Sequence, residues 1–306
     1  ATVQLTLEWT DTIDSPIVLT GQLATSQLQL ASPQWFGQEV FQSQVAAYSG
    51  SLSIGADRIV ANNASFELDH GRVNVHGAVP LAILGHSSWQ TTLSVLANED
   101  VQAGGTIDLA KLAAALPQTF RIRQDTTITG GQLTFRAGSQ SNDGFRKWDL
   151  HLQSSNLTAQ TNGQPVVWNQ PIDVQVAARQ TATGPQIEQI ACHCDFLQLG
   201  GKGDLNDASF NGRVDLTLLS RRLGDFVDLK GATLAGMANI NLRLYRVGDS
   251  QQVELQGGAA LSEFQCTIAD AIAWQEQALR ISLEGTLIAP PDFSSVGVQV
   301  GGLKLV

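Results

Sequence analysis

The stretch KWDLHLQSS, residues 147–155, alternates apolar and polar side chains along its length. Trp148, Leu150 and Leu152 fall on one side of an extended chain, and their polar neighbours fall on the other. Because successive side chains of a β-strand point to opposite faces, this period of two predicts a strand with one dry side and one wet side. One-faced alternation is typical of antiparallel sheet, whereas parallel strands buried on both faces are apolar throughout.

The same alternation recurs along most of the chain, and short tracts rich in Gly, Asn, Asp and Ser separate the runs as turns. The stretch from Ala82 to Asp100 is less regular, and we expect strand there rather than helix. The sequence therefore predicts an all-β fold. The dry side of its strands is predicted to carry Leu133, Phe135, Leu150, Leu152, Ile172, Val174, Val176, Ile240, Leu242, Leu244, Val253 and Leu255.

Two segments that lie 107 residues apart read as copies of one unit. They are GGTIDLAKLAAALPQTFRI, residues 104–122, and NGRVDLTLLSRRLGDFVDL, residues 211–229. In each copy an Asp precedes leucines spaced three and four apart, which predicts a capped, amphipathic helix. Asp108 and Asp215 are the predicted caps, and Pro117 and Gly224 are predicted to end these short helices.

This repeat sets the expected domain organisation, because a fixed internal period indicates one supersecondary unit stacked on itself. We predict one continuous repetitive β module over residues 1–306, with approximate repeats at 104–210 and 211–306 and a looser copy within 1–103. We also expect the chain to be a fragment of a longer protein, since both of its ends read as strands.

A comparison of apolar surfaces predicts the architecture. Many strands each send about three apolar side chains to the dry side, whereas two helices of about ten residues can cover only a small part of it. Either the sheet closes on itself, or it is elongated and twisted and curls into an apolar trough. We expect the trough, because a closed sandwich usually has bulky aromatic residues at its centre and aromatic residues make up only 6% here. An open apolar face of this size indicates a lipid or another apolar ligand.

The charge of the chain excludes polyanionic partners. Its 28 acidic residues outnumber 18 basic ones, which gives a net charge of −10. Nucleic acids and anionic lipid headgroups are bound by basic patches, and no cluster of four or more Lys and Arg occurs. No apolar run approaches the ~20 residues that a membrane-spanning helix requires.

The chain carries few residues with the spacing of a catalytic or metal site. We expect Cys192 and Cys194 to be small buried hydrophobes on one strand face, and the sequence leaves open a disulfide from either one to Cys266. Because a strand directs His193 away from both thiols, we do not predict zinc there. A solvated surface position is expected for each histidine, namely His70, His76, His86, His151 and His193.

Carboxylates occur in close pairs, for example Asp204 with Asp207, but these pairs lie at expected turns, where Asp is common. A glycosidase that uses two such carboxylates is the third interpretation that the sequence leaves open. We predict a non-enzymatic protein without cofactor or metal.

The helix signatures TIDLAKLAAALP, residues 106–117, and RVDLTLLSRRLGDF, residues 213–226, resemble those of the AsmA-like and TamB-like envelope proteins of bacteria. In that family a short Asp-Leu-x-x-Leu helix recurs among Gly-punctuated strands, and the proteins are similar to the bridge-like lipid-transfer proteins. The resemblance covers most of residues 104–285 and, more weakly, residues 19–79.

This resemblance implies a trough that carries phospholipid or another acyl lipid, lined by the dry-side residues named above. It implies a location in the periplasm or cell envelope, membrane attachment through a segment that is not in this chain, and envelope protein partners that the sequence does not identify. The family pattern contains no catalytic residues. The alternative is a closed β-sandwich or β-solenoid that serves as a structural or adhesive surface module without a ligand.

Overall fold

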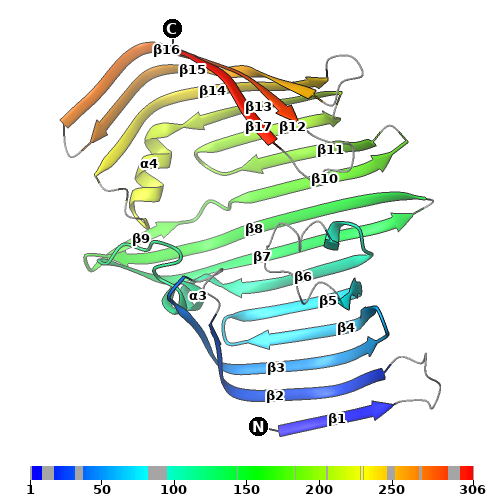
Figure 1. Cartoon of the computed structure of the whole chain (residues 1–306). Helices are drawn as coiled ribbons and strands as arrows, with labels where there is room; N and C mark the ends of the chain where they lie inside the picture. Colours follow the sequence, from blue (N-terminus) through cyan, green and yellow to red (C-terminus); the bar gives the residue numbers. More distant parts are fainter. Residues whose placement is uncertain are drawn as a thin grey trace. The chain divides into compact units, whose positions relative to one another are not determined.

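The computed structural model describes residues 2–8, 17–31, 37–81, 95–142, 144–182, 184–204, 206–227, 229, 231–246, 252–268, 271–288 and 297–305. In this part of the chain the fold is all-β and antiparallel, and the sheet is not closed on itself (Figure 1). The predicted fold class is therefore confirmed. The chain divides into two compact units, Ala1–Val167 and Trp168–Val306. This division does not coincide with a predicted repeat boundary.

Unit 1 is an antiparallel meander, in which each strand from β1 to β8 pairs with the next one. One short helix, α3, interrupts it between β6 and β7. The elements are β1 Thr2–Glu8, β2 Ile17–Ala31, β3 Val40–Ile54, β4 Arg58–Leu68, β5 Gly71–Pro80, β6 Val101–Asp108, α3 Leu109–Ala115, β7 Thr126–Asn142, β8 Phe145–Thr161 and β9 Gln164–Trp168, whose last residue belongs to unit 2.

Unit 2 repeats this plan, with every strand from β10 to β17 paired to the next one. The helix α4 follows β13 as α3 follows β6. The elements are β10 Asp173–Thr181, β11 Gly184–His193, β12 Leu197–Asp204, β13 Asp207–Asp215, α4 Leu216–Gly224, β14 Ala232–Arg246, β15 Gln252–Ile268, β16 Ala271–Ile288 and β17 Gly297–Leu305.

The prediction of a strand between Ala82 and Asp100 is wrong for residues 95–100, which the structure describes. Residues 95–97 are helical, and a turn and a bend follow them before β6 begins at Val101. Residues 82–94 lie outside the described part of the chain. The helical residues 95–97 help to position β8, because the carbonyl of Ala97 accepts a hydrogen bond from Nε1 of Trp148 at 2.6 Å.

Both helices begin at the predicted caps. The carboxylate of Asp108 accepts a hydrogen bond from the backbone N–H of Lys111 at 3.0 Å, and that of Asp215 accepts one from the N–H of Leu218 at 2.8 Å. Each cap satisfies one of the backbone donors that a helix start leaves unpaired. α4 ends at Gly224 as predicted, whereas α3 ends at Ala115, two residues before Pro117.

Side chains of α4 also take the place of a neighbouring strand. β13 ends at Asp215, so the backbone N–H groups at the start of β14 have no strand beside them on that side. The hydroxyl oxygens of Ser220 and Thr217 accept hydrogen bonds from the N–H groups of Leu234, at 2.7 Å, and Gly236, at 3.1 Å. The helix is thereby fixed against β14.

The long hairpins that follow the two helices bend at matching points. In unit 2 the bend occurs at Gly236 on β14, with φ +107°, and at Glu263 on β15, with φ +53°. In unit 1 the bend occurs at Gly131 on β7, with φ +135°, and at Asn156 on β8, with φ +53°. The strand register shifts at or beside these residues, as at β-bulges, which locally bend and twist a sheet.

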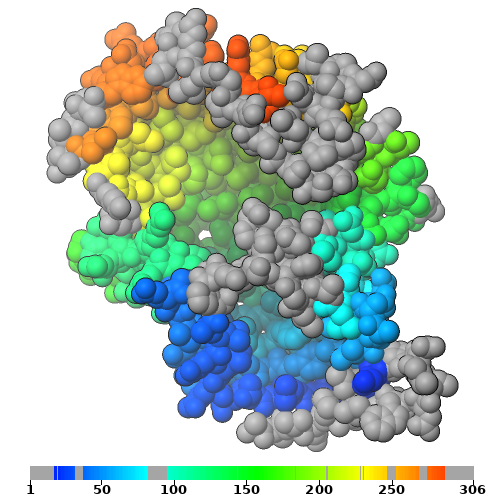
Figure 2. All heavy atoms as spheres, in the orientation of Figure 1, coloured from blue at the N-terminus to red at the C-terminus, as the bar shows by residue number. Residues whose placement is uncertain are grey.

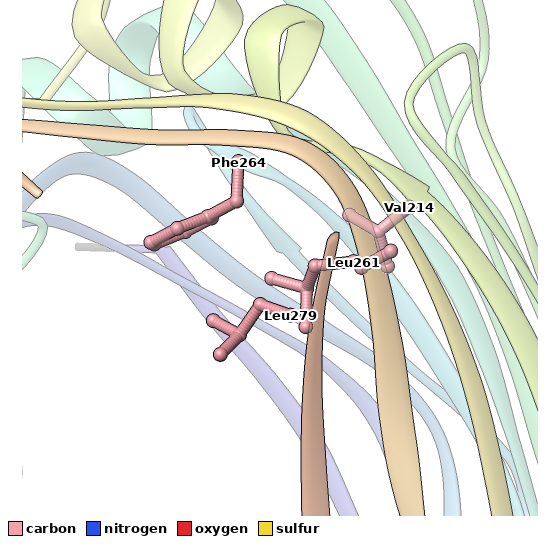
Figure 3. Packing of buried hydrophobic residues seen from close by; sticks show 5 residues of the cluster. Val214, Leu261, Phe264 and Leu279 are labelled. Carbon is pink, nitrogen blue, oxygen red and sulfur yellow. The ribbon is translucent and has the colours of Figure 1, made fainter. Parts of the chain in front are cut away.

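A buried apolar cluster forms at the bend of unit 2. Phe264, Leu261 and Leu279 gather on the inner side of the bent strands (Figure 3). Val214 and Ala238 complete the cluster, and Leu216 and Leu219 from α4 pack against it. The apolar side chains at the bend are therefore buried by one another and by these two leucines.

Candidate functional site

The strand register gathers the apolar side chains of unit 2 on one face, which we call the apolar face of unit 2. Directly paired residues lie on the same side of a sheet. Two adjacent rows of pairs cross the strands from β10 to β16. The first row is Val176, Ile190, Gly201, Phe210, Leu242, Gly257 and Leu283, and the second is Val174, Cys192, Leu199, Gly212, Ile240, Ala259 and Ile281.

The remaining predicted dry-side residues of unit 2 lie at the ends of these rows. Leu244 and Leu255 are directly paired and lie next to the first row, and Val253 is paired with Arg246. Ile172 precedes β10 and is half-buried. Apart from Ile172, which precedes the paired strands, the prediction therefore identified residues that the fold brings onto one face.

A corresponding apolar face exists in unit 1. One row of direct pairs contains Leu23, Tyr48, Phe66, Val73, Gly105, Phe135 and Leu152. Leu150 and Leu133 lie two residues away from this row, on its two sides, because they pair with Ala137 and Ser154. The four predicted dry-side residues of unit 1 therefore share one face.

Neither apolar face is sealed by the residues that the structure describes. Of the twelve predicted residues only Val253 is buried, at 2% exposed, and the others are half-buried. In unit 1 Leu23 and Phe66 are 41% and 42% exposed. The buried cluster at the bend differs, since Leu279 and Phe264 are 5% and 8% exposed. Each apolar face thus has a large part that remains open.

The shape of unit 2 places its apolar face in a hollow. The atoms of β10 to β13, drawn in green, lie recessed behind the yellow and orange atoms of α4 and β14 to β16 (Figure 2). α4 lies on this recessed side (Figure 1).

The opposite, polar face of unit 2 carries charge pairs. The guanidinium of Arg243 donates two hydrogen bonds to the carboxylate of Asp207, at 2.8 and 2.9 Å, and lowers the pKa of that carboxyl. Arg179 and Glu188 lie 3.2 Å apart. These pairs line a shallow hollow of about 650 Å³. The polar face is therefore hydrated and charged, as the alternation predicts.

Ser43, Asp69 and His70 lie together in unit 1, but the carboxylate rather than the imidazole is the direct partner of the serine, which does not suit catalysis. The hydroxyl of Ser43 donates to the carboxylate of Asp69, and Nδ1 of His70 lies 2.8 Å from the same carboxylate, out of line for a hydrogen bond. A nucleophilic serine requires the imidazole as its direct partner, with the carboxylate behind it. Ser43 is only 1% exposed. These three residues therefore have a structural role, which is to fix the β4–β5 turn against β3.

Electrostatics agree with this structural role. Partial burial raises the pKa of Asp69, but hydrogen bonds from Ser43 and from the N–H of Gln44 outweigh it and hold the pKa below its ordinary value. His70 is 7% exposed and its ring lies 4.8 Å from that of Phe41. The prediction of a solvated His70 is wrong, because the β4–β5 turn folds this side chain under β3.

The other histidines and the cysteines lie apart from any catalytic arrangement. His76, His151 and His193 are exposed on polar faces as predicted, and His86 lies outside the described residues. The three cysteines are free and half-buried, so Cys192 and Cys194 are less buried than expected, and partial burial raises the pKa of their thiols. β11 ends at His193, so Cys194 lies in the following turn rather than on the strand. Within the described part of the chain, no three potential metal ligands cluster.

Sequence reasoning missed several members of the apolar faces. Leu23, Tyr48 and Phe66 were not predicted, although their own strands alternate, and Leu199 and Phe210 were overlooked because glycines interrupt the pattern around them. Counting glycines as apolar positions would have identified them, since Gly201 and Gly212 occupy dry-side positions.

No protein-family model, curated protein or solved structure matches this chain. Among the described residues, no helix has the length and apolar character needed to cross a membrane.

Proposed function

We propose that this chain is a non-enzymatic lipid-binding module of the bacterial cell envelope, which carries the acyl chains of phospholipids along its apolar faces and passes lipid between membranes. The observation that supports this proposal is the open state of those faces. Eleven of the twelve predicted dry-side residues remain half-buried, while a cluster at the bend of the same sheet is buried. Soluble proteins rarely expose large contiguous apolar patches unless they bind something there.

The energetics suit an acyl ligand. Burying a 16-carbon chain removes about sixteen methylene-sized groups from water at ~0.8 kcal/mol each, or roughly 13 kcal/mol before the cost of immobilisation. Apolar contacts have no preferred direction, so a chain could move from strand to strand without passing through a deep energy minimum. No covalent step is required.

The location and partners follow from the resemblance to the AsmA-like and TamB-like proteins. We place the chain in the periplasm, held at a membrane through a segment outside this sequence and working with envelope proteins at its ends. The acidic charge fits this role, because the ligand is held by apolar contact with its tails rather than by cationic contact with its headgroup.

The alternative is a structural or adhesive surface module. The sealed cluster around Phe264 and the hydrated, ion-paired polar face favour it, since both would serve a scaffold without a ligand. Lipid content separates the two functions.

Protein purified without detergent is expected to release phospholipid on organic extraction, as measured by mass spectrometry. Leu150→Asp and Val174→Asp place a charge on each apolar face and are expected to reduce the lipid content. His151→Asp and Gln175→Asp place the same charge one residue away on the polar faces, and they are expected to leave the lipid content unchanged. A stable, lipid-free protein, or equal lipid content in all four variants, would contradict the proposal.

A further inference from the structure

The ring of Phe210 lies across the neighbouring strand rather than standing away from the sheet. Phe210 on β13 is directly paired with Gly201 on β12. A Cβ built on Gly201 would collide with Cδ1 of that ring and would lie 2.8 Å from Cε1 and 3.1 Å from Cγ. The ring edge thus occupies the space that any other residue at position 201 would fill.

Position 201 is a glycine because of this ring. Its backbone has no positive φ that would itself require glycine, and its three nearest neighbours are all atoms of Phe210. Gly200 provides the contrast on the polar face, where a Cβ would have the carbonyl oxygen of Ile190, at 4.0 Å, as its nearest neighbour. Two adjacent glycines therefore differ in what a methyl group would meet.

The same arrangement recurs along the apolar face of unit 2. Leu199 places Cδ1 3.0 Å from the Cβ position of Gly212, and Leu242 places Cδ2 2.6 Å from that of Gly257, where the backbone carbonyl of Asn241 is nearer still. Each large side chain lies over a glycine of the strand beside it, so the side chains project less far from the plane of the sheet. Phe210 is the largest of these side chains and lies in the middle strands of the row.

We infer that Gly201 and Phe210 form a depth-setting pair, which keeps the apolar face of unit 2 shallow and even and so selects unbranched acyl chains. This inference rests on the proposed function. With the ring laid over Gly201, a straight chain can run along the row in contact with successive strands. A methyl group at position 201 lifts the ring into the space above the sheet, where it blocks that path. Removal of the ring leaves a depression that accommodates a branch.

The first experiment compares Gly201→Ala with Gly200→Ala, using a fluorescent 16-carbon straight-chain fatty acid as the probe. Gly201→Ala is expected to weaken binding about tenfold, which corresponds to the loss of about two methylene contacts. Gly200→Ala is expected to bind within about twofold of the unmodified protein, as for a surface substitution. In Gly201→Ala/Phe210→Ala the new methyl group has room, so this double variant is expected to bind as Phe210→Ala does.

The second experiment does not depend on the folding of Gly201→Ala. Phe210→Ala is expected to increase binding of phytanic acid, a methyl-branched fatty acid, relative to palmitic acid by about fivefold or more, roughly the value of one newly buried methyl group. Circular dichroism checks that each variant keeps its strand content.

The outcomes separate this inference from the proposed function. If the unmodified protein binds no fatty acid and carries no lipid, the proposed function fails and this inference fails with it. If the unmodified protein binds the straight-chain probe but Gly201→Ala binds equally well, only the depth-setting pair is overturned. An unchanged preference between palmitic and phytanic acid in Phe210→Ala, or a double variant no better than Gly201→Ala, overturns it as well.

Discussion

Truncation of two phenylalanines on the same sheet should show directly which part of unit 2 is sealed. Phe264 is 8% exposed inside the bend, and its ring meets that of Trp274 edge-on at 5.1 Å and 77°. Phe210 is half-buried on the open part of the apolar face. We expect Phe264→Ala to destabilise unit 2 about three times as much as Phe210→Ala.

The structure gives the size of each effect. Phe264→Ala removes a buried ring and leaves a cavity, which costs about 3–5 kcal/mol. We expect a value near 3 kcal/mol, because Trp274 is 39% exposed and can relax towards the space. Phe210→Ala forfeits only about half of the ~1.5–3 kcal/mol that full burial of a phenylalanine provides, or about 1 kcal/mol. It leaves no enclosed cavity, since that site is already open.

Backbone amide exchange measures these costs within unit 2 itself. Peptides from β13 to β16 report the free energy of opening under native conditions, and the two variants are compared with the unmodified protein. Phe145→Ala in unit 1, at a side chain that is 46% exposed, serves as a control and should leave these peptides unchanged. Equal costs for Phe210 and Phe264 would refute the reasoning, because they would mean that Phe210 is covered as fully as the residues at the bend.

Three further predictions concern the helices and their supports. Asp215→Ala should destabilise α4 by about 1 kcal/mol and Asp215→Asn by much less, as measured by urea denaturation, because only alanine removes the cap. Ser220→Ala should speed amide exchange at Leu234, whose N–H loses its acceptor, and unchanged exchange would mean that this bond forms too rarely to matter. Partial burial raises the pKa of Glu39, but hydrogen bonds from Gln118 and Thr119 lower it by more, so the pKa lies below the ordinary 4.5. The stabilisation by Glu39 is therefore complete above that value and lost as the pH falls through the lowered pKa, so Glu39→Gln should flatten the acid limb of the stability profile.

The all-β class and the two helix starts could be predicted because they depend on local chemistry. Alternation around Leu150 and Leu242 follows from the two faces of a strand, and Asp215 caps α4 through a backbone donor three residues away. The buried position of His70 could not be predicted, since it depends on β3 passing over the β4–β5 turn. The bends were also missed, because the left-handed backbone at Asn156 and Glu263 lies where the register is interrupted, at residues without a direct partner, which alternation does not mark.

Whether a dry-side residue is sealed or open is the property that decides function, and alternation cannot encode it. Leu242 in β14 and Leu261 in β15 lie on the same face of the same sheet, in strands of similar composition, yet Leu261 is 9% exposed under the bend and Leu242 is half-buried beyond it. The difference lies at the bend, where Val214, Ala238, Phe264 and Leu279 pack around Leu261. The bend, which alternation does not encode, therefore decides which dry-side residues are buried, and beyond it Leu242 and its neighbours in the row stay half-buried.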